Sequence, residues 1–168
     1  MKILVTGGTG FIGSHLCYYL ITSGRKVICL DNNSTGNIKN IFSIASHENF
    51  TYIEKDITEP FSIKDIIDLK NVYEIYHLAC PASPKAYQED PIKTLQTNFI
   101  GTMNVLDLAK QINAAVLLTS TSEIYGDPTI SPQVETYWGN VNTIGPRSCY
   151  DEGKRVAETL MVEYNRKY

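Results

Sequence analysis

The chain contains 168 residues, 43% of them hydrophobic and 20% charged, which is an ordinary globular composition with enough chain for one folded core. Its net charge of −3 argues against a nucleic-acid surface, because such a surface needs a basic patch. No run approaches the roughly 18 apolar residues of a membrane span, and an early strand leaves no room for a signal peptide.

The cysteine and histidine positions argue against disulfide and metal sites. The four cysteines stand at positions 17, 29, 80 and 149 without a Cys-x-x-Cys pair, so we expect free, buried thiols in a reducing cytoplasm. The three histidines stand at positions 15, 47 and 77, without the spacing of metal ligands, so no metal is expected.

A glycine-rich turn follows the first predicted strand. The apolar run 2–6 reads as a buried parallel strand, and a helix is predicted over 14–22. Between them lies a G-x-x-G-x-x-G spacing. Gly7 permits the tight turn, Gly10 lets the backbone approach a pyrophosphate at the helix N-terminus, and Gly13 permits close helix packing. A glycine-rich turn without a ligand is the alternative.

An acidic residue ends the second predicted strand, 26–31. Asp31 lies 18 residues beyond Gly13, close to the interval expected for the carboxylate that binds the adenosine ribose. A carboxylate repels a 2′-phosphate, and asparagines follow where an arginine would indicate NADP, so NAD is favoured. A surface acid at a strand end is the alternative.

Further strands and helices alternate along the chain, which predicts an α/β doubly wound, Rossmann-like parallel sheet with strand order 3-2-1-4-5. Ligands in such sheets lie beyond the carboxyl ends of the strands. Asp56 follows the third strand there and can accept a bond from an adenine amine. The remaining predicted strands are 50–54, 72–78 and 115–120, and the helices are 41–46, a weak 63–69 and a long 90–112, capped by Asp90 and Pro91.

Tyr150 and Lys154 are four residues apart at the start of a predicted helix and therefore share one face. An ammonium one turn away lowers the pKa of a phenol, so the pair could make a general base. A solvated helix face is the alternative. The preceding segment, 124–148, shows no periodicity, and loops of this length inside a domain are usually functional.

These motifs resemble the extended short-chain dehydrogenase/reductase superfamily, whose members act on nucleotide sugars with NAD. Three stretches resemble UDP-glucuronate decarboxylases (UDP-xylose synthases) more narrowly, and they are 77–84, 120–128 and 137–155. Related 4,6-dehydratases carry Thr-Asp-Glu where this chain has Thr121, Ser122 and Glu123, and C4 epimerases carry two hydroxyl residues and then small residues there. A dehydratase, an epimerase, a cofactor-binding module without turnover and a purely structural partner surface are the alternatives.

The resemblance implies a catalytic set and a mechanism. Tyr150 would take the proton from the sugar C4 hydroxyl, Thr121 would bond the C4 oxygen, and Lys154 would hold the phenolate and the nicotinamide ribose. The 4-keto acid formed would lose carbon dioxide, with Glu123 positioning the sugar or governing the proton that reaches C5. The implied substrate-binding residues are Pro81, Ala82, Asn104, Lys110, Thr121 and Tyr150, a solvated helix end being the alternative for Lys110.

The resemblance also implies a set of NAD contacts. They are Gly7, Gly10, Phe11, Ile12, Gly13, Asp31, Asn32, Ser34, Thr35, Gly36, Asp56, Ile57, Leu78, Ala79, Cys80, Thr97, Tyr150 and Lys154. Two departures from the family pattern affect ligand contacts. Asn33 replaces an aromatic residue on the adenosine side, and Gln96 replaces a lysine that contacts substrate.

The resemblance covers the whole chain, but family members are nearly twice as long. We therefore expect residues 1–168 to form a single NAD-binding domain that is truncated within the Tyr-x-x-x-Lys helix and lacks the C-terminal substrate-binding part. Helices 90–112 and 149–168 would form a homodimer interface. The fifth strand would be left as an open sheet edge.

Overall fold

The fold is taken from a computed structural model that describes residues 1–62 and 69–168. The weak helix predicted over 63–69 falls almost entirely outside the described residues. Within the described part, no helix is both long and apolar enough to cross a membrane.

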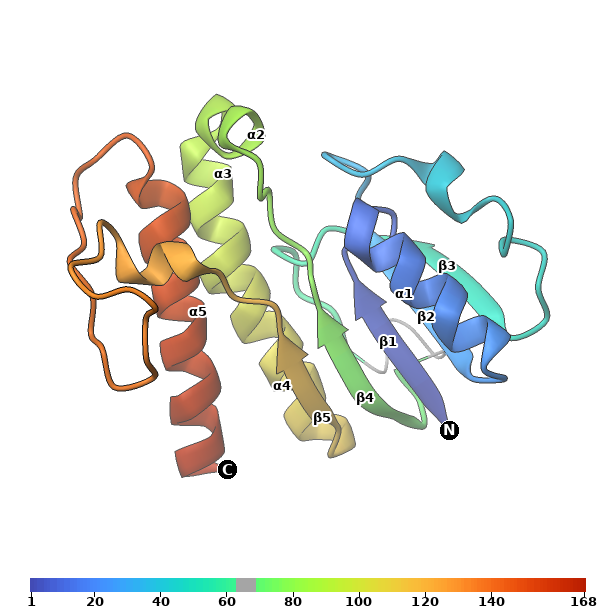
Figure 1. The fold of residues 1–168 in the computed structure, drawn as a ribbon. Coiled ribbons are helices and arrows are strands. Elements are labelled where there is room, and N and C mark those ends of the chain that lie inside the picture. Colours follow the sequence, from blue (N-terminus) through green and yellow to red (C-terminus); the bar gives the residue numbers. More distant parts are fainter. Residues whose placement is uncertain (63–68) are drawn as a thin grey trace.

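A five-stranded parallel sheet forms the centre of the molecule (Figure 1). Its order is β3-β2-β1-β4-β5, which confirms the predicted topology. Strand β4 ends one residue earlier than predicted and β5 two residues earlier, because the chain leaves the sheet at these points and enters the loops of the site. The strands are β1 (Lys2–Thr6), β2 (Lys26–Asp31), β3 (Phe50–Glu54), β4 (Val72–His77) and β5 (Ala115–Leu118).

Both faces of the inner strands are buried, as their near-continuous apolar sequences require. Leu4 of β1 pairs with Ile28 of β2 and Ile75 of β4, and together they pack against Val105 and Leu108 of the long helical segment behind the sheet. Alternate β1 residues face α1 (Phe11–Thr22) on the other side. The edge strand β5 alternates between half-buried and exposed residues, so one of its faces is open.

The helix α1 begins at Phe11, three residues earlier than predicted. Gly10 adopts an extended conformation at its N-cap, so the helix starts directly from the glycine turn. The prediction of a helix over 41–46 is wrong. A single 3-10 turn, η1 (Ile38–Ile41), precedes that segment, because the Asn37 side chain accepts a bond from the Lys39 amide and caps the turn there; residues 42–46 form turns.

The long helix predicted over 90–112 is one continuous helical segment with an irregular middle. It consists of α3 (Pro91–Gln96), the π-helical turn η3 (Thr97–Gly101) and α4 (Thr102–Ile112). Asp90 caps it as expected, accepting a bond from the Lys93 amide at 2.9 Å. The preceding helix α2 (Pro84–Glu89) was not predicted, although Ser83 and Pro84 form an N-cap signal.

The final helix, α5 (Ser148–Lys167), packs against α3, η3 and α4 (Figure 1). Close approach depends on Gly153, where an added Cβ would lie 2.8 Å from the Asn98 amide nitrogen. The segment before α5 is irregular, as predicted, except for the 3-10 turn η4 (Ser122–Tyr125). The fold therefore brings Thr121, Glu123 and the start of α5 to the carboxyl edge of the sheet.

All four cysteines are free, as expected, but only Cys17 and Cys29 are fully buried. Their thiols lie together beneath the glycine turn. A Cβ at Gly8 would clash with the Cys29 sulfur and lie 3.3 Å from that of Cys17. A hydrogen bond with Cys17 and burial raise the pKa of the Cys29 thiol far above its ordinary value.

Candidate functional site

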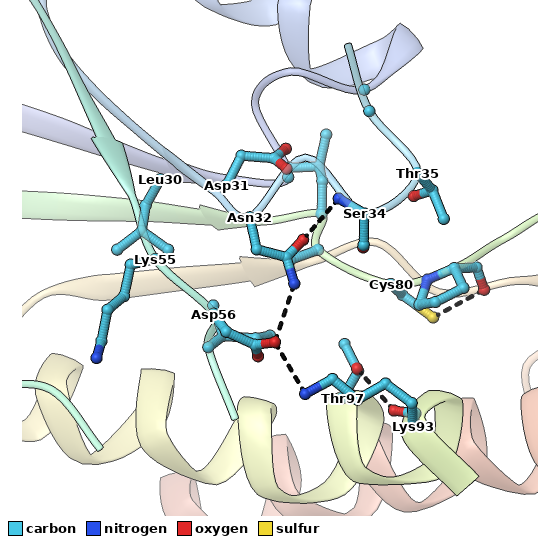
Figure 2. A pocket seen from close by; sticks show the side chains of 17 residues that line it. Leu30, Asp31, Asn32, Ser34, Thr35, Lys55, Asp56, Cys80, Lys93 and Thr97 are labelled. Carbon is cyan, nitrogen blue, oxygen red and sulfur yellow. Dashed lines mark hydrogen bonds and ion pairs between the residues drawn. The ribbon is translucent and has the colours of Figure 1, made fainter. Parts of the chain in front are cut away.

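A cleft lies at the carboxyl ends of β1, β2, β3 and β4 (Figure 2). It brings together most of the residues predicted to contact a dinucleotide, one residue predicted to contact substrate, and three residues that were not predicted. The first group contains Gly7, Gly10, Asp31, Asn32, Ser34, Thr35, Gly36, Asp56, Ile57, Leu78, Ala79, Cys80 and Thr97, the second is Pro81, and the third contains Leu30, Lys55 and Lys93.

The glycine turn forms the floor of this cleft. Gly7 has a φ of +72°, and an added Cβ would lie 2.7 Å from the Ala79 amide nitrogen. A Cβ at Gly13 would clash with the Gly7 carbonyl oxygen, so helix α1 touches the turn directly. Among the described residues, no side chain caps this helix start. Its first amides and its dipole therefore provide an anion-binding position.

The side chains of Phe11 and Ile12 point to solvent, 80% and 65% exposed, and do not line the cleft. Phe11 instead packs its ring edge-on against His15, with the ring centroids 5.1 Å apart. Only the backbone of these two residues can therefore take part in the predicted anion contact. Gly13 likewise serves the packing of the helix and does not line the cleft.

Asp31 is buried at the end of β2 with part of its hydrogen-bonding capacity unused. One carboxylate oxygen accepts the Thr9 amide at 2.9 Å and the other accepts the Asn33 amide at 2.8 Å. A carboxylate has about four acceptor positions, so two remain for hydroxyl groups of a ligand. The Asn33 backbone is left-handed, with φ 56°, which asparagine tolerates better than an aromatic residue.

Asp56 lies at the end of β3 and accepts bonds from three side chains. Asn32 and Lys93 donate to one oxygen at 2.9 and 2.8 Å (Figure 2). The amide and hydroxyl of Thr58 donate to the other oxygen at 2.8 and 2.7 Å. Burial alone would raise the pKa of this carboxyl, but these donors outweigh it and hold the pKa far below its usual range. Asp56 is therefore ionised.

His77 lies beneath the cleft and was not predicted as a site residue. Its Nδ1 lies 2.7 Å from the Thr6 hydroxyl and its Nε2 lies 3.1 Å from that of Thr102. Burial and the nearby charge of Lys154 lower its pKa to about 3, so the imidazole is neutral. The Thr6 hydroxyl also accepts the Ala79 amide at 3.3 Å, which ties the imidazole to the cleft wall.

Tyr150 is buried on the first turn of α5, and its ring stacks on that of Tyr87 with the centroids 4.8 Å apart. Burial raises its pKa, while a hydrogen bond with the Thr121 side chain partly opposes that effect. The expectation that Lys154 lowers this pKa is wrong. Lys154 is buried and donates to the Thr119 carbonyl oxygen at 2.8 Å, and its own pKa is lowered by burial.

Glu123 forms an ion pair with Arg147, a residue that the sequence motifs did not indicate as part of the site. The Glu123 amide also donates to the Thr121 hydroxyl at 3.3 Å. Arg147 precedes α5 and its carbonyl accepts the Tyr150 amide at 2.9 Å. A chain of contacts thus links Tyr150, Thr121, Glu123 and Arg147.

Cys80 connects this second group to the cleft. It lines the cleft, and its thiol is hydrogen-bonded with the side chain of Asn98, against which Gly153 of α5 packs between Tyr150 and Lys154. Burial raises the pKa of the Cys80 thiol, and its sulfur lies 3.2 Å from the Pro81 carbonyl oxygen. Tyr150 and Lys154 therefore adjoin the cleft without lining it.

Three predicted substrate residues lie elsewhere. Asn104 donates to the Ile57 carbonyl oxygen at 2.8 Å and so supports the cleft wall from behind. Lys110 places its ammonium 3.6 Å from the Tyr168 ring centre, beside the amino end of β5, because α4 runs away from the site. Ala82 is exposed and does not line the cleft. Among the described residues, no cluster of His, Cys, Asp or Glu is arranged to hold a metal.

The fold and site define a doubly wound parallel-sheet protein with a glycine turn, a strand-end acid and a Tyr-x-x-x-Lys helix. The chain belongs to the GDP-mannose 4,6 dehydratase family, whose sequence profile matches residues 4–168. This agrees with the extended short-chain dehydrogenase/reductase superfamily that the motifs resembled.

Relatives with assigned names are similar over the whole chain. It is 56% identical to UDP-glucuronic acid decarboxylase 6 of Arabidopsis thaliana over 169 residues, which cover 100% of this chain and 47% of the relative. It is 54% identical to UDP-glucuronic acid decarboxylase 1 of Xenopus tropicalis over 166 residues, 99% of this chain and 38% of the relative. The chain thus spans half or less of the length of the curated relatives it matches.

Solved structures share the fold. A UDP-glucose 4-epimerase of Thermotoga maritima in complex with UDP-glucose superposes with a TM-score of 0.84 at 30% identity, covering 100% of this chain and 52% of that one. The dTDP-glucose 4,6-dehydratase DesIV of Streptomyces venezuelae, with NAD and TYD bound, gives a TM-score of 0.86 at 26% identity and the same coverage.

Proposed function

We propose that this chain is the cofactor-binding half of an NAD-dependent UDP-glucuronate decarboxylase, which forms UDP-xylose through a 4-keto intermediate. The observation that carries the proposal is the chain of contacts from Cys80 in the cleft through Asn98 to Gly153, which lies between Tyr150 and Lys154 on α5. These contacts place a proton-transfer residue next to a site suited to a dinucleotide. Identity to UDP-glucuronic acid decarboxylases over the whole chain supports the choice of reaction.

The residues of the cleft fit NAD. A Cβ at Gly7 would meet the Ala79 backbone, so this position can hold only glycine, and the uncapped first amides of α1 offer donors to a pyrophosphate. Asp31 retains two acceptor positions for a ribose diol, and its negative charge disfavours a 2′-phosphate. NAD is therefore the cofactor we propose, in preference to NADP.

The Tyr150 group supplies the acid–base chemistry of the proposed reaction. Bound NAD would supply the oxidising equivalent at C4 and, as NADH after decarboxylation, the hydride that reduces the C4 ketone to the alcohol of UDP-xylose; its positive charge would favour a phenolate. Tyr150 accepts the C4 hydroxyl proton and later returns it, with Thr121 bonding the same oxygen. Lys154 uses one of three N–H groups on the Thr119 carbonyl, which leaves two for a ligand.

Loss of carbon dioxide follows from the substrate chemistry. Once C4 is a ketone, the C5–C6 bond breaks, its electron pair moves into an enolate at C4, and a proton then adds at C5. The Glu123 amide is bonded to Thr121 and its carboxylate is paired with Arg147, so we propose that Glu123 accepts a hydrogen bond from a sugar hydroxyl and fixes the ring. We assign Glu123 and Arg147 to this positioning.

A cofactor-binding module without turnover is the second candidate. It is favoured by the composition of the cleft, which is built entirely from residues 7–97. Reactions resembling those of the epimerase and dehydratase neighbours are further alternatives for the same site.

We also propose that the protein forms a homodimer through the α3–α4 segment and α5, and that it works in a reducing cytoplasm. Exposed apolar side chains on these helices support the interface: Ile92, Leu95, Phe99 and Val162. The four free cysteines support the compartment. Light scattering of the purified chain measures the oligomeric state directly.

The test is a thermal melt of the chain alone, with NAD, with NADP, and with NAD plus UDP-glucuronate, followed by mass-spectrometric detection of UDP-xylose. A ligand at 100 times its Kd stabilises by about 2.7 kcal/mol, which for this size is a rise of roughly 5–10 °C. We expect NAD to stabilise and Tyr150→Phe to keep that effect while abolishing any product. A cooperative melt that NAD leaves unchanged would refute the cofactor assignment. NAD binding without product would favour the binding module.

A further inference from the structure

His77 is a buried polar residue that no step of the proposed chemistry uses. It is the last residue of β4 and is 2% exposed. An apolar side chain would fill this position without the cost of burying polar atoms, whereas a buried imidazole needs hydrogen bonds at its ring nitrogens. The two partners of these nitrogens, Thr6 on β1 and Thr102 on α4, therefore indicate what the imidazole does.

The hydrogen bonds around the imidazole have a defined direction. His77 is neutral, so one ring nitrogen accepts and the other donates. The Thr6 hydroxyl oxygen already accepts the Ala79 amide at 3.3 Å, which leaves its proton to be donated to His77 Nδ1 at 2.7 Å. The Nε2–H group then donates to the Thr102 hydroxyl at 3.1 Å. This arrangement pairs both ring nitrogens and places the imidazole proton on Nε2.

The Thr6 end of this network leads to the wall of the cleft. Thr6 does not line the cleft itself, but its carbonyl accepts the Leu78 amide at 3.1 Å and its hydroxyl accepts the Ala79 amide. These two bonds fix the start of the segment 78–81, all of which lines the cleft. The fit is close, because a Cβ at Gly7 would lie 2.7 Å from the Ala79 amide nitrogen. A small shift of Ala79 would therefore change the shape of the cleft.

The Thr102 end leads away from the cleft. Thr102 is the first residue of α4, behind the sheet, and it does not line the cleft. It is 1% exposed and Thr6 is 0% exposed, so both hydroxyls are buried against the same imidazole. The two threonines thus match in residue type, burial and partner. They differ in one respect, which is that only Thr6 also holds the cleft wall.

We propose that His77 is a positioning residue of the cofactor site. By accepting the Thr6 proton, its Nδ1 turns the Thr6 oxygen toward the Ala79 amide and so holds the cleft wall in the shape that binds NAD. His77 lies beneath the cleft and acts through Thr6. This inference rests on the proposed NAD function, and it concerns how the cleft is held rather than which residues touch the cofactor.

Valine substitutions of the two threonines separate positioning from packing. Thr6→Val and Thr102→Val each remove one hydroxyl that contacts the imidazole, so both should lower the urea midpoint. Isothermal titration calorimetry with NAD should show a loss of about 3- to 10-fold in Thr6→Val, the equivalent of one neutral hydrogen bond. Thr102→Val should stay within about 2-fold of wild type, as expected for an independent site. Equal losses of affinity in both variants would overturn the inference, because loosening of the core would then explain them.

Substitutions of His77 test whether the effect of Thr6 passes through the imidazole. Asparagine places an amide oxygen near the position of Nδ1, whereas glutamine places its amide near that of Nε2. We therefore expect His77→Asn to bind NAD more tightly than His77→Gln, with both less stable than wild type. Adding Thr6→Val to His77→Gln should cost little further affinity, because both changes remove the same contact. Equal affinities of the two His77 variants, or additive losses in the double variant, would contradict the proposed role.

The wild-type chain provides two further checks. Nitrogen-15 NMR of the imidazole should show the proton on Nε2, and a proton on Nδ1 would remove the acceptor on which the proposal depends. The threonine pair decides the matter if a His77 variant does not fold. A wild-type chain that melts cooperatively yet does not bind NAD would refute the proposed function itself, whereas normal binding by wild type and by Thr6→Val would refute only the positioning role.

Discussion

The ring of Tyr150 lies flat on the ring of Tyr87, with the centroids 4.8 Å apart and the planes 7° from parallel. Tyr87 comes from α2 and is 3% exposed, so the stack fixes the proposed base from a second element. We expect Tyr87→Leu to destabilise the chain by about 1–2 kcal/mol through loss of the aromatic pair. We also expect it to lower any turnover by misplacing Tyr150, while NAD affinity, measured by calorimetry, stays within about 3-fold because Tyr87 lies outside the cleft.

The control for this prediction is Tyr87→Phe, which keeps the ring and removes only the hydroxyl. It should retain both the melting temperature and the near-ultraviolet circular dichroism of the stacked pair. If Tyr87→Leu is as stable and as active as Tyr87→Phe, the stack has no positioning role.

His77 makes stability depend on pH in a defined window. Its pKa is lowered from 6.5 to about 3 in the folded chain. Between these values the unfolded chain takes up a proton that the folded chain refuses, so stability is complete above about pH 6.5 and falls as the pH decreases toward 3. The low pKa of Asp56 adds a further loss only below the ordinary aspartate range, near pH 4.

Urea unfolding between pH 7 and pH 4.5 measures this slope. We expect His77→Gln to be less stable at pH 7, because the contacts with Thr6 and Thr102 are changed, but to lose less stability on acidification. An identical slope in the variant and in the wild type would show that other groups cause the acid sensitivity.

Alanine substitutions at Gly13 and Gly24 test two different costs, steric crowding at Gly13 and backbone strain at Gly24. A Cβ at Gly13 would clash with the Gly7 carbonyl, whereas one at Gly24 would meet nothing within 4 Å but would suffer the strain of φ +76°. We expect Gly24→Ala to cost about 1 kcal/mol and Gly13→Ala about 1–3 kcal/mol. Urea midpoints measure both, and only Gly13→Ala should also weaken NAD binding by shifting the turn. Equal effects on stability and binding would contradict this assignment.

Arg147 should affect turnover much more than stability. Its ion pair with Glu123 is partly exposed, and such pairs contribute about 0–1 kcal/mol. Arg147→Gln should therefore melt within a few degrees of wild type and bind NAD normally, yet lose most UDP-xylose formation. Arg166→Gln is the matched control, because Arg166 forms a similar exposed pair with Glu163. Comparable turnover in both variants would remove Arg147 from the site.

The sequence allowed the sheet and its order to be predicted because each strand is a short apolar run that ends at a turn, an acid or a proline-rich segment. The cleft followed from the same logic, since strand ends in parallel sheets gather at one edge. The extent and internal regularity of the helices were harder to predict than the strands. The π-helical turn of η3 leaves the apolar spacing almost unchanged, and the capping signal of Ser83 was masked by the surrounding prolines.

Residues whose role depends on a distant partner could not be predicted. Lys93 and Arg147 become notable only when the fold places them against Asp56 and Glu123. The pKa of Tyr150 was expected to fall because the sequence shows the spacing of charges but not the burial that opposes it. Lys110 has the right residue type, but the direction of α4 carries it to the opposite end of the sheet.

The two buried thiols beneath Gly8 give the chain an internal reporter of local opening. Cys17 and Cys29 are both 0% exposed, so an alkylating reagent can reach them only when α1 separates from the turn. Their labelling rate therefore measures the free energy of that opening, while the more accessible Cys80 and Cys149 report on the rest of the chain. A ligand held by the turn would slow the labelling of the first pair without any engineered probe.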